Sequence, residues 1–398
     1  MDKRALRSAR GIVASLVLLG AWGITSALGG CGSSSDDPLP PRSPRPVVDA
    51  GGEGGFDGGG GGGPPAPDAG GYCGNEVHQA IVDAPNLYFV LDASGSMQAP
   101  APVPGGTRYD AVRGAVVDLV RKLGPLVKVG AALLPAQGSN QDQCAAGKQV
   151  FPVTQGDPIT GEDGPTTTGI RVTTATNPVG GTPISPTLEA LTPTLLALDG
   201  KTYVILATDG GPNCNESAAC GIEACMPNFE GDEACLATGT NCCAPGQVWG
   251  PTFCVDEPAS VAAIEALHAG GVEVFVVGIP GSEAYAGVLD AMAIAGGSPQ
   301  VAAPFYYPVS ELGALGGVLG EIAAVAVTCE FTIVDPPSEE DMTNVYLDAE
   351  VLPYNDPDGW IWKPPWIVRL VGKACERLQG GQVKQVQIVS GCPTEMPK

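Results

Sequence analysis

Residues 86–96 read Asn-Leu-Tyr-Phe-Val-Leu-Asp-Ala-Ser-Gly-Ser, and this stretch decides the fold class. The continuous apolar run at residues 87–91 is typical of a strand that is buried on both faces of a parallel sheet. Three oxygen-bearing side chains follow at once, those of Asp92, Ser94 and Ser96. The stretch therefore predicts a core strand that ends in a polar loop.

Strands and helices alternate along the chain after this stretch. Apolar residues between Arg108 and Leu123 repeat with the period of a helix that buries one face. Similar patterns predict strands at 127–134, 202–207 and 272–279, and helices at 183–198, 260–268, 284–295 and 311–327. The alternation predicts an α/β fold with a doubly wound, mostly parallel sheet, whose ligands bind beyond the carboxyl ends of the strands.

The N-terminal residues predict export and a lipid anchor. A basic region at residues 3–10 precedes a mostly apolar stretch at 12–22, as in a signal peptide. Residues 28–31 read Leu-Gly-Gly-Cys, which resembles a bacterial lipobox, so we expect lipid on Cys31 and a place on the membrane surface. An ordinary secretory signal with a chance cysteine is the alternative. The residue after Cys31 is not Asp, which favours the outer membrane of the bacterial cell envelope.

Composition then divides the chain into four parts. The signal peptide covers 1–30, and a tether rich in Gly, Pro and Ser covers 31–72. The α/β domain covers 73–328. From 329 to 398, short apolar runs separated by Pro, Gly and Asp predict a small β-rich module.

Two further segments belong with the polar loop if the sheet is doubly wound. Gly180-Gly181-Thr182 enters a helix and Thr208-Asp209-Gly210 leaves a strand, so both are expected at the same sheet edge. Asp-x-Ser-x-Ser, Gly-Gly-Thr and Thr-Asp-Gly, in this order, resemble the metal-ion-dependent adhesion site of von Willebrand factor type A (vWA) domains. The resemblance extends over roughly residues 86–327, including the order of strands and helices.

The resemblance implies a ligand set and a role. Ser94, Ser96 and Thr182 would bind a divalent cation directly, while Asp92 and Asp209 would bind it directly or through water. Hydroxyl and carboxylate oxygens suit Mg²⁺ first, with Ca²⁺ or Mn²⁺ as alternatives, rather than zinc. Neutral hydroxyls leave the ion incompletely neutralised, so an acidic side chain of a partner protein can take a coordination position. Thr208 is the alternative ligand in the third segment.

The cysteines predict disulfides in an oxidising compartment. An insertion at 211–257 interrupts the α/β pattern. Setting Cys31 aside leaves an even number of cysteines, whose pairing the sequence does not give. They are Cys73, Cys144, Cys214, Cys220, Cys225, Cys235, Cys242, Cys243, Cys254, Cys329, Cys375 and Cys392. A zinc cluster in the insertion is disfavoured, because the insertion has neither His nor paired Cys-x-x-Cys spacing. The insertion leaves the sheet beside Asp209. It either contributes to the choice of partner protein or is only a loop held by disulfides.

Other candidate features favour structural roles. Residues 356–359, Asp-Pro-Asp-Gly, indicate a turn rather than a calcium loop, since Tyr354 occupies the first ligand position. The tryptophans at 360, 362 and 366 are expected in the core rather than on a sugar-binding face. His78 and His268 are expected to have structural roles.

Charge and motifs limit the function classes. The formal net charge of −23 disfavours nucleic acid as a partner. No Ser/His/Asp grouping, His-Glu-x-x-His motif or phosphate loop is present, so we do not predict an enzyme. The sequence favours a lipid-anchored protein for metal-dependent recognition or adhesion. The alternatives are an envelope scaffold with a structural metal and a metal-dependent hydrolase.

Overall fold

The computed structural model describes residues 74, 76–101, 106–137 and 143–396, which all belong to one compact unit, Arg45–Lys398. The predicted signal peptide, the lipidation site Cys31, the tether and Cys73 lie outside the described residues. Within the described part, no helix combines the length and the apolar character needed to cross a membrane.

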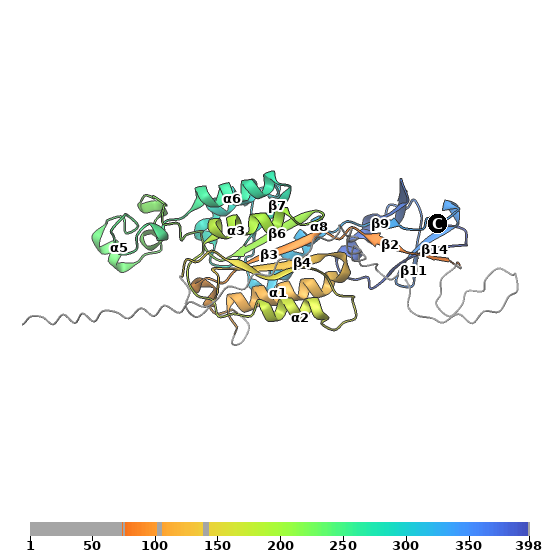
Figure 1. Cartoon of the computed structure of the whole chain (residues 1–398), viewed down its shortest axis with the longest axis horizontal. Coiled ribbons are helices and arrows are strands. Elements are labelled where there is room, and N and C mark those ends of the chain that lie inside the picture. The colour runs from red at the N-terminus through yellow and green to blue at the C-terminus, as the bar shows by residue number, and fades with distance from the viewer. Residues whose placement is uncertain (1–73, 75, 102–105, 138–142, 397–398) are drawn as a thin grey trace, which may run out of the picture. The chain divides into compact units, whose positions relative to one another are not determined.

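A six-stranded sheet forms the centre of the α/β domain, in the order β5-β4-β3-β6-β7-β8 (Figure 1). Its strands are β3 (Asn86–Asp92), β4 (Lys128–Leu134), β5 (Lys148–Gln155), β6 (Thr202–Thr208), β7 (Val272–Gly278) and β8 (Tyr307–Pro308). All neighbours run parallel except β5, which pairs antiparallel with β4 at the sheet edge. The predicted fold class, a doubly wound and mostly parallel α/β sheet, is confirmed.

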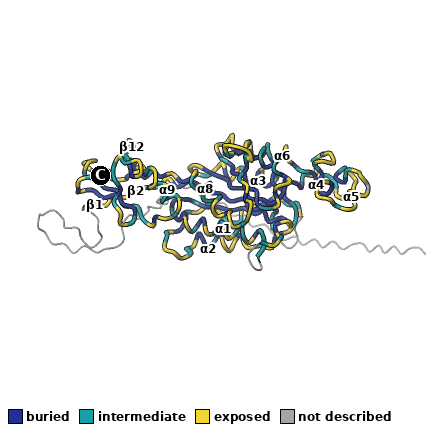
Figure 2. The backbone as a smooth tube through the Cα atoms, turned by 180° about the vertical axis from the view of Figure 1, so that it is seen from behind, coloured by how far each residue is buried: buried dark blue, intermediate teal, exposed yellow. Residues whose placement is uncertain are grey.

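Helices cover both faces of this sheet (Figure 1). They are α1 (Arg108–Leu123), α2 (Pro165–Thr173), α3 (Ile184–Leu196), α6 (Glu257–Ala269), α7 (Ala286–Ala295) and α8 (Leu315–Ala326). Alternate residues of β3 point to opposite sides: Leu87 and Phe89 join the core with α1 and α8, while Tyr88 and Val90 join the core with α3, α6 and α7. The strands run through the buried centre of the domain (Figure 2). Each such buried side chain contributes roughly 1.5–3 kcal/mol to folding.

Helix α1 begins and ends as its sequence predicts. The Thr107 hydroxyl accepts a hydrogen bond from the Asp110 backbone N–H, and the Thr107 N–H donates to the Asp110 carboxylate, which is a capping box. Such a cap contributes about 1 kcal/mol. Gly124, with φ of +51°, follows the last helical residue and leads into Pro125.

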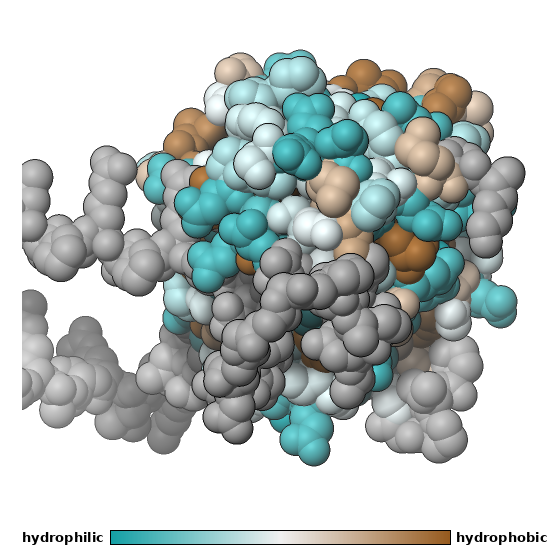
Figure 3. All heavy atoms as spheres, turned by 90° about the vertical axis from the view of Figure 1, so that its right-hand side faces the viewer, coloured by the Kyte–Doolittle hydropathy of each residue, from teal (hydrophilic) through white to brown (hydrophobic). Residues whose placement is uncertain are grey.

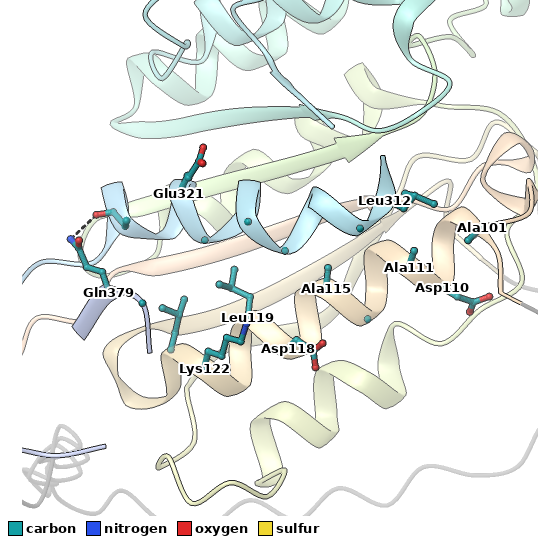
Figure 4. A pocket seen from close by; sticks show the side chains of 18 of the residues that line it. Ala101, Asp110, Ala111, Ala115, Asp118, Leu119, Lys122, Leu312, Glu321 and Gln379 are labelled. Carbon is teal, nitrogen blue, oxygen red and sulfur yellow. Dashed lines mark hydrogen bonds between the residues drawn. The ribbon is translucent and has the colours of Figure 1, made fainter. Parts of the chain in front are cut away.

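A groove of about 870 Å³ lies between α1 and α8 and reaches α9 (Gly372–Gln379) (Figure 4). Small residues line much of it, including Gly114 on α1 and Gly316, Gly317 and Gly320 on α8. A Cβ atom added at any of these four glycines would meet no atom within 4 Å. Packing inside the chain therefore does not require them to be glycine.

The C-terminal module contains two four-stranded antiparallel sheets. One has the order β1-β14-β10-β11 and the other β12-β13-β9-β2. Their strands are β1 (Glu76–His78), β2 (Ala80–Val82), β9 (Glu330–Ile333), β10 (Thr343–Leu347), β11 (Glu350–Leu352), β12 (Trp360–Lys363), β13 (Ile367–Leu370) and β14 (Val386–Ser390). Hydrophilic and hydrophobic side chains are interspersed on the face of this module shown in Figure 3.

The structure corrects the predicted boundaries in this region. The expected α/β domain began at residue 73, but β1 pairs with β14 and β2 pairs with β9, so both strands belong to the sheets of the C-terminal module. The β-rich character predicted for this module is confirmed, and helix α9 lies in it as well. A disulfide joins Cys329 to Cys375 on α9.

Disulfides hold the insertion between β6 and α6, which carries the short helices α4 (Met226–Phe229) and α5 (Glu233–Thr238). The bonds are Cys144–Cys214, Cys220–Cys254, Cys225–Cys243 and Cys235–Cys242. The sulfur atoms of Cys220, Cys243 and Cys254 lie within 4.8 Å of one another, but each is already in a disulfide and is not a free thiolate ligand. Cys392 is disulfide-bonded as well.

Candidate metal centre

Parallel pairing brings the predicted site segments to one edge of the sheet. Strands β3 and β6 are neighbours with Leu91 opposite Ala207, so Asp92 and the residues after Ala207 lie side by side. Directly after β3, the Ala93 N–H donates to the Leu134 carbonyl at 2.6 Å, which ties the start of the loop to the end of β4. The carboxyl ends of three adjacent strands thus hold the loop that carries Ser94 and Ser96.

The Asp92 carboxylate is fully buried and accepts two hydrogen bonds. Its Oδ1 accepts from the Ser94 backbone N–H at 2.8 Å, and its Oδ2 accepts from the Thr208 hydroxyl at 2.6 Å. Thr208, the alternative ligand of the sequence analysis, therefore points its hydroxyl at Asp92. These contacts fix the orientation of the Asp92 side chain.

A hydrogen-bonded chain connects the two serines to the second carboxylate. The Ser96 hydroxyl donates to Asp209 Oδ1 at 2.6 Å, and the Ser94 and Ser96 Oγ atoms lie 3.0 Å apart. Because Ser96 gives its proton to Asp209, Ser94 is the donor in the Ser94–Ser96 bond. Four of the five predicted site residues, including Asp92 through the Ser94 N–H, thus form one connected group.

The loop with the fifth residue, Thr182, packs against this group. The Gly95 N–H donates to the Gly180 carbonyl at 2.8 Å, and the hydrogen bonds that place Thr182 are made by its backbone, whose N–H donates to Asn213 Oδ1 at 2.7 Å. A Cβ at Gly95 would lie 3.5 Å from the Gly180 carbonyl oxygen, an ordinary contact, so this position does not require glycine. The loop does require glycine at Gly180, which has φ of +90° and a Cβ position 2.5 Å from the Gln143 carbonyl oxygen.

An arginine that the sequence analysis did not identify completes the polar group. Arg108, the first residue of α1, places Nη1 2.7 Å from Asp209 Oδ2. The Asp209 side chain is fully buried and that of Arg108 is 25% exposed. Each oxygen of Asp209 therefore has one partner, a serine hydroxyl on one side and a guanidinium on the other.

The carboxylates of Asp92 and Asp209 are both buried at this edge of the sheet, and this raises the pKa of Asp92. The pKa of Asp92 is raised to about 7, first by burial and second by the negative charge of Asp209, and hydrogen bonds from Thr208 and Ser94 only partly offset these effects. Burial of like charges destabilises the ionised pair. A bound cation would relieve this cost.

The donor set fits a hard divalent cation. Asp92, Ser94, Thr182 and Asp209 are buried, whereas Ser96 is exposed, so the group opens to solvent on one side. Carboxylate and hydroxyl oxygens dominate the group, and thiol or imidazole ligands that would favour zinc take no part in its hydrogen bonds. The residues present are therefore suited to hold Mg²⁺, Ca²⁺ or Mn²⁺.

The remaining candidates have structural explanations. Trp360 is fully buried and its Nε1 donates to the Leu352 carbonyl, as expected for a core residue. Trp362 is half-buried and Trp366 is exposed, so the expected core position is wrong for Trp366. His78 is buried, and its ring nitrogens lie 2.7 Å from the Asp335 carbonyl and the Ser390 hydroxyl. At residues 356–359, the Gly359 N–H donates to the Asp356 carbonyl at 3.1 Å, which closes the predicted turn.

Fold and site together define an α/β chain with an oxygen-lined polar group at the carboxyl edge of a doubly wound sheet. No family model matches the sequence, and no curated protein matches it. Among solved structures, the pilus adhesin SpaC from Lactobacillus rhamnosus GG is similar, with a TM-score of 0.44 and 16% identity over 77% of this chain and 39% of that one. The PilB minor pilin from Streptococcus sanguinis has a TM-score of 0.39 and 17% identity over 60% of each chain. The VWA domain of SpRpn10 has a TM-score of 0.35 and 11% identity over 60% of this chain and 95% of that one.

Proposed function

We propose that this chain binds a divalent cation at the carboxyl edge of its sheet and uses it to recognise an acidic side chain of a partner protein. The observation that carries the proposal is the connected group of Asp92, Ser94, Ser96 and Asp209, with the Thr182 loop held against it. Mg²⁺ is the proposed ion, because the donors are hydroxyl and carboxylate oxygens.

The ligand set follows the vWA pattern residue by residue. Ser94, Ser96 and Thr182 bind the ion directly, and Asp92 and Asp209 bind it directly or through water. The exposed side of the group, at Ser96, is where a coordination position is open to a partner. A carboxylate of that partner then replaces a water molecule on the ion.

The proposed setting is the bacterial cell envelope, with lipid on Cys31 holding the chain to the outer membrane. The disulfides at the insertion and at Cys329–Cys375 support an oxidising compartment outside the cytoplasm. Incorporation of labelled fatty acid into the wild-type chain, and its loss in Cys31→Ser, tests the anchor independently of the metal site.

The metal site itself is tested by Ser94→Ala, with Ser298→Ala as the matched control. Ser298 donates its hydroxyl to the Glu273 carboxylate, outside the polar group. We expect calorimetric titration with Mg²⁺ to show binding to the wild type and to Ser298→Ala, and at least about tenfold weaker binding to Ser94→Ala, because one direct ligand is lost. Equal Mg²⁺ affinity in both variants would overturn the proposal.

The recognition step is tested with the same variants. Capture from envelope extracts is expected to retain a partner protein with Mg²⁺ on wild-type chain, and to lose it with chelator or Ser94→Ala. Retention of the same proteins under all three conditions would contradict metal-bridged recognition.

A further inference from the structure

Asp209 depends on a distant residue for its positive partner. Between Lys201 and Lys363 the sequence contains no Lys or Arg, so neither the loop after β6, the insertion nor the loop after β7 supplies a permanent cation. The ion pair comes instead from Arg108, 101 residues before Asp209 in the chain. Arg108 is therefore the residue that supplies a positive charge to Asp209, and it is not one of many cations on a basic surface.

Arg108 is held by the loops around it through both its backbone and its side chain. Its backbone N–H donates to the Ala99 carbonyl at 2.8 Å, which ties it to the loop that carries Ser96. Across the edge, a Cβ added to Gly281 would lie 2.4 Å from Arg108 Nη1, and Gly281 has φ of +116°. The glycine leaves the space that the guanidinium occupies next to Asp209.

Arg108 changes the net charge of the site when a divalent ion is bound. The carboxylates of Asp92 and Asp209 together balance the two charges of a divalent ion. The guanidinium of Arg108 is therefore an excess positive charge once the ion is bound. Its contact with Asp209 Oδ2 also draws electron density away from the carboxylate that faces the serines.

We propose that Arg108 is a positioning residue that sets the charge of the metal site, weakening its hold on the cation and leaving the loaded site net positive toward a carboxylate. The inference rests on the proposed metal-binding function. It predicts effects of opposite sign: removing the guanidinium strengthens cation binding and weakens carboxylate binding. A purely structural arginine would weaken both when removed, because the loop geometry would be lost.

Calorimetric titration of the full-length chain with Mg²⁺ tests the first effect. We expect Arg108→Met to bind Mg²⁺ about tenfold more tightly than the wild type, because a like charge close to the partly buried ion is removed. Arg108→Lys, which keeps the charge, is expected to stay close to the wild type. The matched control is Arg113→Met on the same helix, whose Nη2 donates to the Arg171 carbonyl and not to the site.

The second effect is measured with acetate as the carboxylate probe and Mn²⁺ as the ion. Paramagnetic broadening of the acetate signal reports binding next to the metal. We expect weaker broadening with Mn²⁺-loaded Arg108→Met than with the loaded wild type or Arg113→Met. Equal or stronger broadening in Arg108→Met would overturn the inference.

The outcomes separate this inference from the proposed function. If the wild type binds neither Mg²⁺ nor Mn²⁺, the proposed function is wrong and the inference is wrong with it. If the wild type binds Mg²⁺ but Arg108→Met binds it equally or more weakly, only the inference is wrong. If Arg108→Met folds only with Mg²⁺ present, the rate of Mg²⁺ release after addition of chelator is measured instead of the titration. We expect slower release from Arg108→Met than from the wild type. Equal or faster release would contradict the inference.

Discussion

Asp92 is a buried carboxylate whose environment raises its pKa. It is fully buried, and both of its carboxylate oxygens are oriented by hydrogen bonds from the Ser94 N–H and the Thr208 hydroxyl. Its pKa of about 7 shows that burial and the charge of Asp209 outweigh those hydrogen bonds. The ionised form of Asp92 therefore destabilises the folded protein.

This raised pKa predicts a pH dependence of the cation-free protein. In chelator, we expect the free energy of unfolding to fall as pH rises from about 4, where an unfolded Asp ionises, to about 7, where folded Asp92 does. The sign follows because the unfolded chain releases its proton first, so ionisation favours unfolding within this window.

Urea unfolding at several pH values in this window measures the effect, with Asp92→Asn as the reference. The difference in unfolding free energy between wild type and variant isolates Asp92 from the other titrating groups. A difference that does not change with pH would show that Asp92 titrates normally.

The polar residues that meet at the edge of the sheet could be singled out from the sequence where a local pattern marks them. Asp92, Ser94 and Ser96 are recognisable because they alternate directly after an apolar strand, and Asp209 because it follows another. Arg108 was not predictable, because a single arginine at the start of an amphipathic helix has no local signal for an ion pair with a residue 101 positions away. Pairing of this kind depends on the tertiary fold.

Among the elements, those with a strong local pattern were predicted best. The predicted helix at Arg108–Leu123 agrees with α1, because its apolar period continues over the whole span. Strand β5 was missed because it lies at the sheet edge, alternates exposed and half-buried residues and contains Pro152, so no apolar run marks it. The predicted helix 311–327 starts as a 3₁₀ turn, and α8 itself begins only at Leu315.

The glycines of α8 yield a prediction about helix stability. Gly320 lies in the middle of α8, and a Cβ there meets no atom within 4 Å. Gly320→Ala is expected to raise the free energy of unfolding by about 0.5–1 kcal/mol, because alanine loses less backbone entropy in a helix. Chemical denaturation measures the change.

The matched comparison is Gly130→Ala in strand β4. A Cβ at Gly130 would lie 2.7 Å from Tyr88 Cδ2 and 2.8 Å from Val153 Cγ2, so this substitution is expected to cost about 1–3 kcal/mol. A loss of stability in Gly320→Ala similar to that in Gly130→Ala would show that the groove beside α8 is filled.

At the scale of the whole molecule, the Cys329–Cys375 disulfide connects the chain just after α8 with helix α9. Because it closes a loop of 46 residues, Cys329→Ser with Cys375→Ser is expected to lower the free energy of unfolding by about 2–4 kcal/mol. Mg²⁺ affinity should not change, since the bond is remote from Asp92 and Asp209 in the fold. Denaturant unfolding and Mg²⁺ titration of the same samples check both statements, and altered affinity would contradict the second.

The pairing of β1 with β14 determines when this protein can finish folding as it is made. Glu76 pairs with Ser390 and His78 with Ile388, while the complete six-stranded sheet is encoded between them. Synthesis proceeds from the N-terminus, so the α/β domain has all of its strands long before β1 meets its partner. Strand β1 therefore cannot form its backbone hydrogen bonds with β14 until β14 has been synthesised. Any chain that stops short of β14 leaves β1 as an open edge available to other chains.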